Sequence, residues 1–202
     1  MATATKKTVL GPKDHGRAMT MEEFDQAIDR EGYRTELIDG RVFVSPVPDA
    51  PHEWVVHWLA EALQAYSRAC PSVINYVSTA ARVFPVGRPG PTSAQPDIAV
   101  YNDFPVGRPF RQFNWRQIHP ILVVEVLSPD NPEKDWERNV ALYPFVPSIQ
   151  EYWILDALSP TLTLTAYRRS GRRWRRPITV PEDGTYSPPL LPGFTLTVNA
   201  QP

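Results

Sequence analysis

Two acidic residues stand in apolar, strand-like segments of this chain, and their placement suggests a metal site. Asp97 lies at the start of the short apolar segment 95–101, and Glu125 interrupts the β-branched, almost wholly apolar segment 121–127. A carboxylate is costly to bury unless a positive or hydrogen-bonding group meets it, so Glu125 needs an explanation. If the two strands are neighbours, both carboxylates can converge on one divalent cation. Mg²⁺ suits such a pair because it takes one or two carboxylates, keeps several waters and leaves room for phosphate oxygens.

At such a site the cation would polarise a phosphodiester and supply a hydroxide-like nucleophile. The alternative interpretation is that Asp97 only caps its strand and Glu125 pairs with an arginine. Spacing alone favours this alternative, because short patterns match by chance.

The segments on either side of Glu125 predict a strand–helix–strand unit. Asn131 is suited to the N-cap of a helix, with Pro132 at the first helical position. We expect this helix over 132–147, followed by a second apolar strand over 152–155. An acid within a sheet, next to a helix that carries polar groups, is a place where chemistry is expected.

The rest of the chain predicts further strands and two more helices. Thr20 and Glu23 form a capping box for a helix that ends near residue 29. Asp39-Gly40 predicts a hairpin between 35–38 and 41–44, and apolar spacing predicts a helix over 52–69. Further strands are predicted over 73–76, 81–84, 161–167, 172–180 and 194–198. The pattern indicates an α/β (α+β) domain built around one central sheet.

Composition is typical of one folded domain. The 202 residues are 42% hydrophobic and include six Trp, enough for a single core over 18–202, whereas the polar residues 1–17 predict a flexible arm. A single cysteine, Cys70, excludes a disulfide framework and fits a reducing cytoplasm. No apolar run reaches membrane-spanning length. A net charge of -1 excludes a generally basic coat for nucleic acid, so any such contact must be local.

One segment, 168–176, offers a local basic patch. It reads RRSGRRWRR and is predicted to form a hairpin. The four arginines nearest its turn are Arg168, Arg169, Arg172 and Arg173. Such a patch suits a phosphate backbone; the alternative is a solvated hairpin tip with Trp174 packing inward.

An ordered set of short motifs carries a resemblance to a known family. The motifs are Glu36-Leu37-Ile38-Asp39-Gly40, His52, Pro96-Asp97, Val124-Glu125-Val126-Leu127-Ser128-Pro129, Asn139, Tyr143 and Glu151-Tyr152-Trp153-Ile154-Leu155-Asp156. Together they resemble the Uma-two family of putative restriction endonucleases, which is similar to the PD-(D/E)XK nuclease superfamily. The resemblance covers about residues 21–198.

The resemblance implies a restriction-endonuclease-like fold, with a mixed sheet flanked by helices, and a phosphodiesterase site that uses Mg²⁺ or Mn²⁺ on DNA. By this resemblance Asp97 and Glu125 bind the metal, and Glu36 is a third acid near them. His52 could line the site, with a capping or surface role as the alternative. A homodimer is expected because enzymes that cut a duplex often need two sites.

This chain departs from the superfamily at its lysine. The lysine usually stands two residues after the glutamate, where this chain has Leu127, and in many family members it stands on the following helix, where this chain has Asn139. Asparagine can orient a water but brings no charge. Lys134 lies roughly 140° from Asn139 around an α-helix, so it could substitute only if the first helical turn is close to the metal. Arg138 is a second substitute, with a solvated surface arginine as the alternative.

Two functions therefore remain open. The first is a magnesium-dependent DNA endonuclease with Asn139 in the lysine's place. The second is a non-catalytic module of the same fold that binds nucleic acid or a protein partner.

Overall fold

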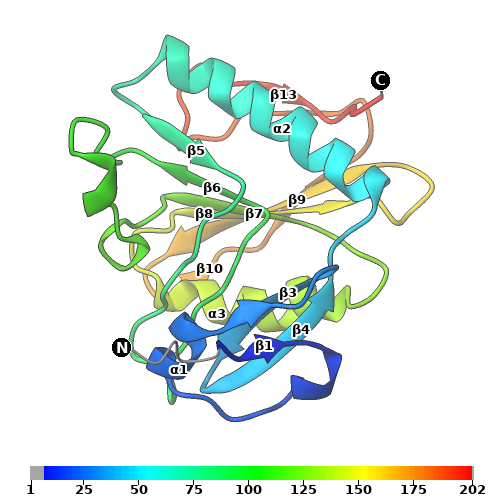
Figure 1. Cartoon of the computed structure of the whole chain (residues 1–202). Helices are drawn as coiled ribbons and strands as arrows, with labels where there is room; N and C mark the ends of the chain where they lie inside the picture. The colour runs from blue at the N-terminus through cyan, green and yellow to red at the C-terminus, as the bar shows by residue number, and fades with distance from the viewer. Residues whose placement is uncertain (1–6, 202) are drawn as a thin grey trace.

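A seven-stranded mixed sheet forms the centre of the computed structural model, which describes residues 7–201 (Figure 1). Its strands are β5 (Tyr76–Ser78), β6 (Ile98–Tyr101), β7 (Leu122–Val126), β8 (Glu151–Asp156), β9 (Thr163–Ser170), β10 (Arg173–Trp174) and β11 (Ile178–Val180). The order is β10-β9-β8-β7-β6-β5, with β11 also paired to β9. Only β7 and β8 run parallel among these described pairs. The mixed α/β architecture expected from the sequence is confirmed.

The chain between the parallel strands β7 and β8 forms the helix that was predicted over 132–147. This helix is a composite of a π-helix, η4 (Lys134–Asn139), one turn of α-helix, α3 (Val140–Leu142), and a 3₁₀ turn, η5 (Tyr143–Phe145). Strands β7 and β8 are buried on both faces, which explains their continuous apolar sequence. The strand–helix–strand prediction is confirmed, but an ordinary α-helix was the wrong form for its first half.

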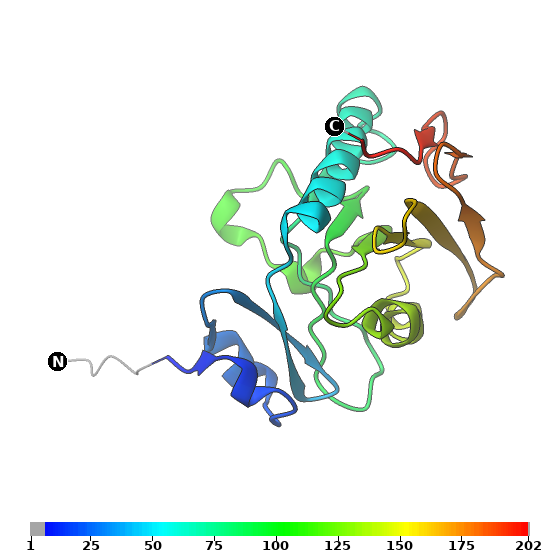
Figure 2. The same cartoon turned by 90° about the vertical axis from the view of Figure 1, so that its right-hand side faces the viewer.

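Helix α2 (Ala50–Ala69) covers the opposite face of the sheet (Figures 1 and 2). Pro51 stands in its first turn, where a missing N–H costs nothing. Its apolar stripe includes Leu59 and Leu63, which are fully buried in the same cluster as the β7 side chains Leu122 and Val124. The helix that the apolar spacing predicted over 52–69 is confirmed.

The segment before the main sheet forms a small unit of its own. Strand β1 (Val9–Leu10) pairs in parallel with β2 (Ile28–Asp29), and between them lie the turn η1 (Pro12–Asp14) and helix α1 (Met21–Gln26). The capping box of α1 is formed as predicted. The flexible arm expected over 1–17 is wrong for residues 7–17, because Leu10 is fully buried beside Phe24; residues 1–6 lie outside the described part.

A hairpin of β3 (Tyr33–Ile38) and β4 (Arg41–Pro46) joins this unit to the sheet. Its turn residues Asp39 and Gly40 have φ of 49° and 77°, the positive pair that a two-residue hairpin turn requires, and the prediction is confirmed. Backbone hydrogen bonds between Leu37 and Ser93 connect β3 to the chain that leads into β6. Figure 1 shows this hairpin on the same side of the sheet as α3.

The remaining elements are short. The chain between β6 and β7 carries the turns η2 (Phe110–Gln112) and η3 (Trp115–Gln117), and β12 (Thr185–Tyr186) pairs with β13 (Leu196–Thr197). The strand predicted over 81–84 is reduced to a single bridge between Val83 and Ala94. None of the helices in residues 7–201 is long and apolar enough to cross a membrane.

Candidate active site

The antiparallel register of β6 and β7 brings the two acids together. Ile98 pairs with Val124, so one residue further along Asp97 stands opposite Glu125. Residues directly opposite in an antiparallel pair project to the same face and have Cβ atoms about 5 Å apart. The sequence-based expectation that these two strands are neighbours is confirmed, and both carboxylates lie on the face that carries η4.

Asp97 is held by three donors from three different elements. Its Oδ1 lies 3.0 Å from a guanidinium nitrogen of Arg34, and its Oδ2 lies 3.2 Å from Nε2 of His52 and accepts the backbone N–H of Val126 at 2.9 Å. Burial raises the pKa of Asp97, but the hydrogen bond with His52 and the charge of Arg34 outweigh it, so that the pKa is lowered. Asp97 is therefore ionised, and His52 lines the site from the first turn of α2.

Glu125 is fully buried, and its two oxygens differ in their surroundings. Oε1 accepts hydrogen bonds from Asn139 Nδ2 at 2.9 Å and from the Tyr143 hydroxyl at 2.6 Å. Oε2 has no hydrogen-bond partner among the described residues and lies 3.6 Å from Nζ of Lys134. Burial raises the pKa of Glu125 well above its ordinary value.

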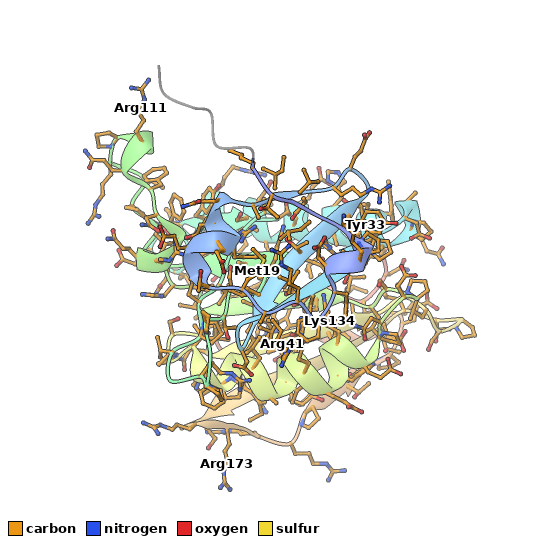
Figure 3. The ribbon with its side chains drawn as sticks, turned by 60° about the horizontal axis from the view of Figure 1, so that its bottom comes forward. Met19, Tyr33, Arg41, Arg111, Lys134 and Arg173 are labelled. Atoms are coloured by element: carbon orange, nitrogen blue, oxygen red, sulfur yellow. The ribbon has the colours of Figure 1, made fainter. Side chains whose placement is uncertain are left out.

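The π-helix brings Lys134 into the site. A helix whose hydrogen bonds run from i to i+5 has more residues per turn than an α-helix, so residues five apart lie nearer to one face, and such segments are frequent at functional sites. Lys134 and Asn139 therefore share a face, and Lys134 Nζ lies 3.6 Å from both Glu125 Oε2 and Asp135 Oδ1. The offset of 140° expected for an α-helix is wrong for this reason. Figure 3 shows Lys134 at the junction of this helix and the β3–β4 hairpin.

Lys134 carries a positive charge in these surroundings. Its side chain is only 11% exposed. Burial lowers the pKa of its amine, but the carboxyl groups of Glu125 and Glu36 raise it above its ordinary value. Asp135, whose pKa burial raises to about 6, accepts a hydrogen bond from Asn139 Nδ2 at 2.9 Å.

Glu36 enters the site from β3 and joins the hairpin to the helix. Its Oε1 accepts the backbone N–H of Gln95 at 2.9 Å, and its Oε2 forms an ion pair with Arg138. Arg138 also donates to Asn139 Oδ1 at 3.1 Å and lies over the ring of Phe43 at 5.1 Å. The alternative interpretation of Arg138 as a solvated surface arginine is therefore wrong.

The ion pair of Glu36 predicts a specific loss of stability in acid. Burial raises the pKa of Glu36, but Arg138 and Lys134 outweigh it and lower the pKa from 4.5 to about 2. A carboxyl group with a lowered pKa stabilises the folded state above pH 4.5, and this contribution of about 3 kcal/mol disappears as the pH falls towards 2. Urea unfolding of Glu36→Gln should therefore show a deficit of about this size at pH 7 that shrinks steadily below pH 4.5. A deficit that does not change with pH would contradict the ion pair.

The donor set fits a hard divalent cation bound by two carboxylates. A carboxylate offers about four lone-pair sites; Asp97 uses three of them and Glu125 uses two, both on Oε1. The cluster also holds four carboxyl groups (Glu36, Asp97, Glu125 and Asp135) against three permanent cations (Arg34, Lys134 and Arg138). Within residues 7–201 no three His, Cys, Asp or Glu side chains are grouped to hold a metal ion. Waters would have to complete the coordination, as Mg²⁺ readily allows.

Three site residues were not recognised as such from the sequence. Arg34 stands two residues before Glu36 on β3, and residues two apart on a strand share a face, so this signal was present. Asp135 lies four residues before Asn139, so the two share a helix face. Tyr143 lies four residues after Asn139, and its hydroxyl donates to Glu125.

The basic hairpin is only partly available for a ligand. The guanidinium of Arg169 donates to the carbonyl oxygens of Tyr143, Pro144, Val146 and Ile149, so it closes the end of the central helix. Arg168 stands opposite Glu151 in the register, on the face of the sheet away from the acids. Arg168 and Arg169 are therefore no longer expected to contact DNA. Arg172 and Arg173 are exposed, and for them the prediction stands. Figure 3 shows Arg173 projecting outward beside the helix, and Trp174 packs inward with its N–H on Val140 O.

Comparisons with known proteins agree with this fold. Residues 21–199 match the profile of the Uma2 family, described as "Putative restriction endonuclease". The fold is similar to a crystal structure of a putative nuclease belonging to DUF820 from Anabaena variabilis, with a TM-score of 0.68 and 20% sequence identity over 89% of this chain and 95% of that one. No curated protein matches the chain. Because the family profile spans most of its length, the chain belongs to the Uma2 family of putative restriction endonucleases.

Proposed function

We propose that this protein is a DNA endonuclease that depends on Mg²⁺ or Mn²⁺, with Asp97 and Glu125 as the metal ligands. The observation that carries the proposal is the pairing of these two acids on adjacent strands, with the buried ammonium group of Lys134 3.6 Å from Glu125. Family membership supports the reaction class, because the family is described as "Putative restriction endonuclease".

The protein holds each ligand in one orientation. Asp97 is fixed by His52, Arg34 and the backbone of Val126. Asn139 and Tyr143 fix Oε1 of Glu125 and leave Oε2 without a hydrogen bond. Such outer partners orient the ligands of a metal site and tune their basicity. Bound between the two carboxylates, Mg²⁺ would polarise the phosphodiester and lower the pKa of a water for attack on phosphorus.

Lys134 supplies the positive charge that Asn139 lacks. Since the carboxyl groups keep its pKa high, Lys134 acts as a cation that stabilises negative charge on the phosphate rather than as a base. Asn139 is a positioning residue: its amide N–H groups go to Glu125 and Asp135, and its carbonyl accepts from Arg138. Glu36 has the same kind of role, because it holds Arg138 over the site.

The test is nicking of supercoiled plasmid DNA with Mg²⁺ or Mn²⁺, compared with the same reaction in EDTA. Glu125→Gln, carried through the same purification, controls for contaminating nuclease. The proposal expects metal-dependent nicking by the natural sequence and none by the variant. Equal nicking by both proteins, or nicking that continues in EDTA, would contradict it.

A non-catalytic DNA-binding module is the second candidate. It is favoured by one observation: each acid already has a basic partner within the protein, and neither Asp97 nor Glu125 is more than 4% exposed. Tight binding of duplex DNA without any nicking would support this candidate.

We also propose a homodimer for double-strand cutting. Sedimentation of the protein on duplex DNA would test it.

A further inference from the structure

A cleft of about 590 Å³ lies outside the acidic site, between helix α1 and the loop that joins β6 to β7. Three separate segments line it: Phe24 and Asp25 from α1, Arg82 and Phe84 from the chain after β5, and the loop residues 111–117. The loop alternates basic, amide and aromatic residues, reading RQFNWRQ. Figures 1 and 2 show it projecting from the β5–β6 edge of the sheet, and Figure 3 shows Arg111 at its outer end.

Two arginines in this cleft lie over aromatic rings. The guanidinium of Arg82 lies 4.8 Å from the ring centre of Phe24, and that of Arg116 lies 4.7 Å from the ring centre of Phe84. A guanidinium over a ring can present those of its five N–H donors that have no protein partner to a phosphate. Asp25 pairs with Arg116 at 2.6 Å, whereas no carboxylate among the described residues pairs with Arg82. The cleft therefore has an excess of positive charge.

Exposed aromatic surface stands beside these charges. Phe113 is 38% exposed and meets Phe104 edge to face, and Trp115 stacks on Tyr101 and also contacts Phe104. An exposed ring on a rigid aromatic base is costly to leave in water, but it offers a platform for a planar ligand. A positively charged groove with aromatic platforms is the arrangement that binds single strands without reading their sequence.

The cleft is connected to the acidic site through the backbone. Val83, between Arg82 and Phe84, is bridged to Ala94. The next residue, Gln95, donates its N–H to Glu36, and Asp97 follows two residues later. The segment that carries Arg82 and Phe84 is thereby fixed to the chain that carries Asp97.

We propose that this cleft binds an unpaired DNA strand, with its phosphates on Arg82 and Arg116 and a base stacked on Phe113. The choice of DNA rests on the proposed function, but binding itself requires neither metal nor cleavage. The protein would then act on DNA that has a single-stranded segment beside the cut position.

The test measures fluorescence anisotropy of a labelled oligothymidylate of about 16 nucleotides in EDTA, with a duplex of the same length as comparison. Phe113→Ala is expected to weaken binding to the single strand roughly tenfold and to leave binding to the duplex unchanged, because paired bases cannot stack on the ring. Arg82→Gln is expected to weaken single-strand binding and to reduce the slope of log K against log salt concentration by about 0.7. Arg82→Lys should restore that slope.

Matched controls lie elsewhere on the surface. Arg68→Gln, in the last turn of α2, and Phe145→Ala, where the ring is 39% exposed, should leave single-strand binding unchanged. Thermal unfolding checks that each variant is folded. Single-strand binding that survives Phe113→Ala, or falls equally in the control variants, would overturn the proposal. The binding assay contains no metal, so a failure of plasmid nicking would not affect the single-strand binding result. A failure of single-strand binding would likewise leave the nicking result unaffected.

Discussion

Lys134→Met is expected to lower the single-turnover rate of Mg²⁺-dependent plasmid cleavage by roughly two to three orders of magnitude. The variant keeps the length and apolar stem of the side chain but removes the ammonium group that lies 3.6 Å from Glu125 and Asp135. That charge would offset negative charge on the phosphate, a role that the neutral side chain of Asn139 cannot fill. Rates at saturating Mg²⁺ measure the effect on the chemical step. Lys13→Met, at an exposed lysine of η1, is the matched control and should cleave at the normal rate.

Moving the positive charge from position 134 to position 139 distinguishes a role of the charge itself from a loss of packing at Lys134. Asn139→Lys alone is expected to reduce cleavage, because it removes the amide that holds Glu125 and Asp135 in place. Combined with Lys134→Met, the same substitution should restore part of the lost rate by returning one positive charge to the shared helix face. Normal cleavage by Lys134→Met would show that the charge of Lys134 is not used.

Glu125→Gln is expected to abolish cleavage while changing the free energy of unfolding at pH 6 by less than about 1 kcal/mol. Removing one partner of an ionised buried pair typically costs about 3–5 kcal/mol. Burial, however, raises the pKa of Glu125 well above its ordinary value, which means that the buried carboxylate is costly to ionise. Glutamine has nearly the same shape and avoids that cost. Urea unfolding in EDTA measures the stability, and the nicking assay measures the activity.

Asp97→Asn provides the opposite case on the neighbouring strand. The pKa of Asp97 is lowered by His52 and Arg34, so the group is ionised and its loss leaves a largely buried guanidinium unpaired. We expect a loss of about 3 kcal/mol or more in the same experiment. Equal stability losses in the two variants would contradict the opposite pKa shifts of the two acids.

The sequence by itself determined the elements and the position of the acids along them. Turn and cap chemistry is local, so Asp39-Gly40 and the Thr20–Glu23 box predicted their turn and helix start correctly. The continuous apolar segment around Glu125 likewise predicted a strand, and the structure buries that strand on both faces. Asp97 and Glu125 lie on one face because the antiparallel register of β6 and β7 sets them opposite each other.

Only the tertiary structure decided which groups meet those acids. The geometry of the helix after β7 depends on its packing between the sheet and the hairpin, and the π-helical form that turns Lys134 inward has no local sequence signal. Arg34 and Arg169 come from strands remote in sequence from the groups that they bind, so nothing in the local pattern separates them from surface arginines. Local interactions specify turns, caps and alternation. Which charged groups surround a buried carboxylate depends instead on contacts between segments that are distant in the sequence.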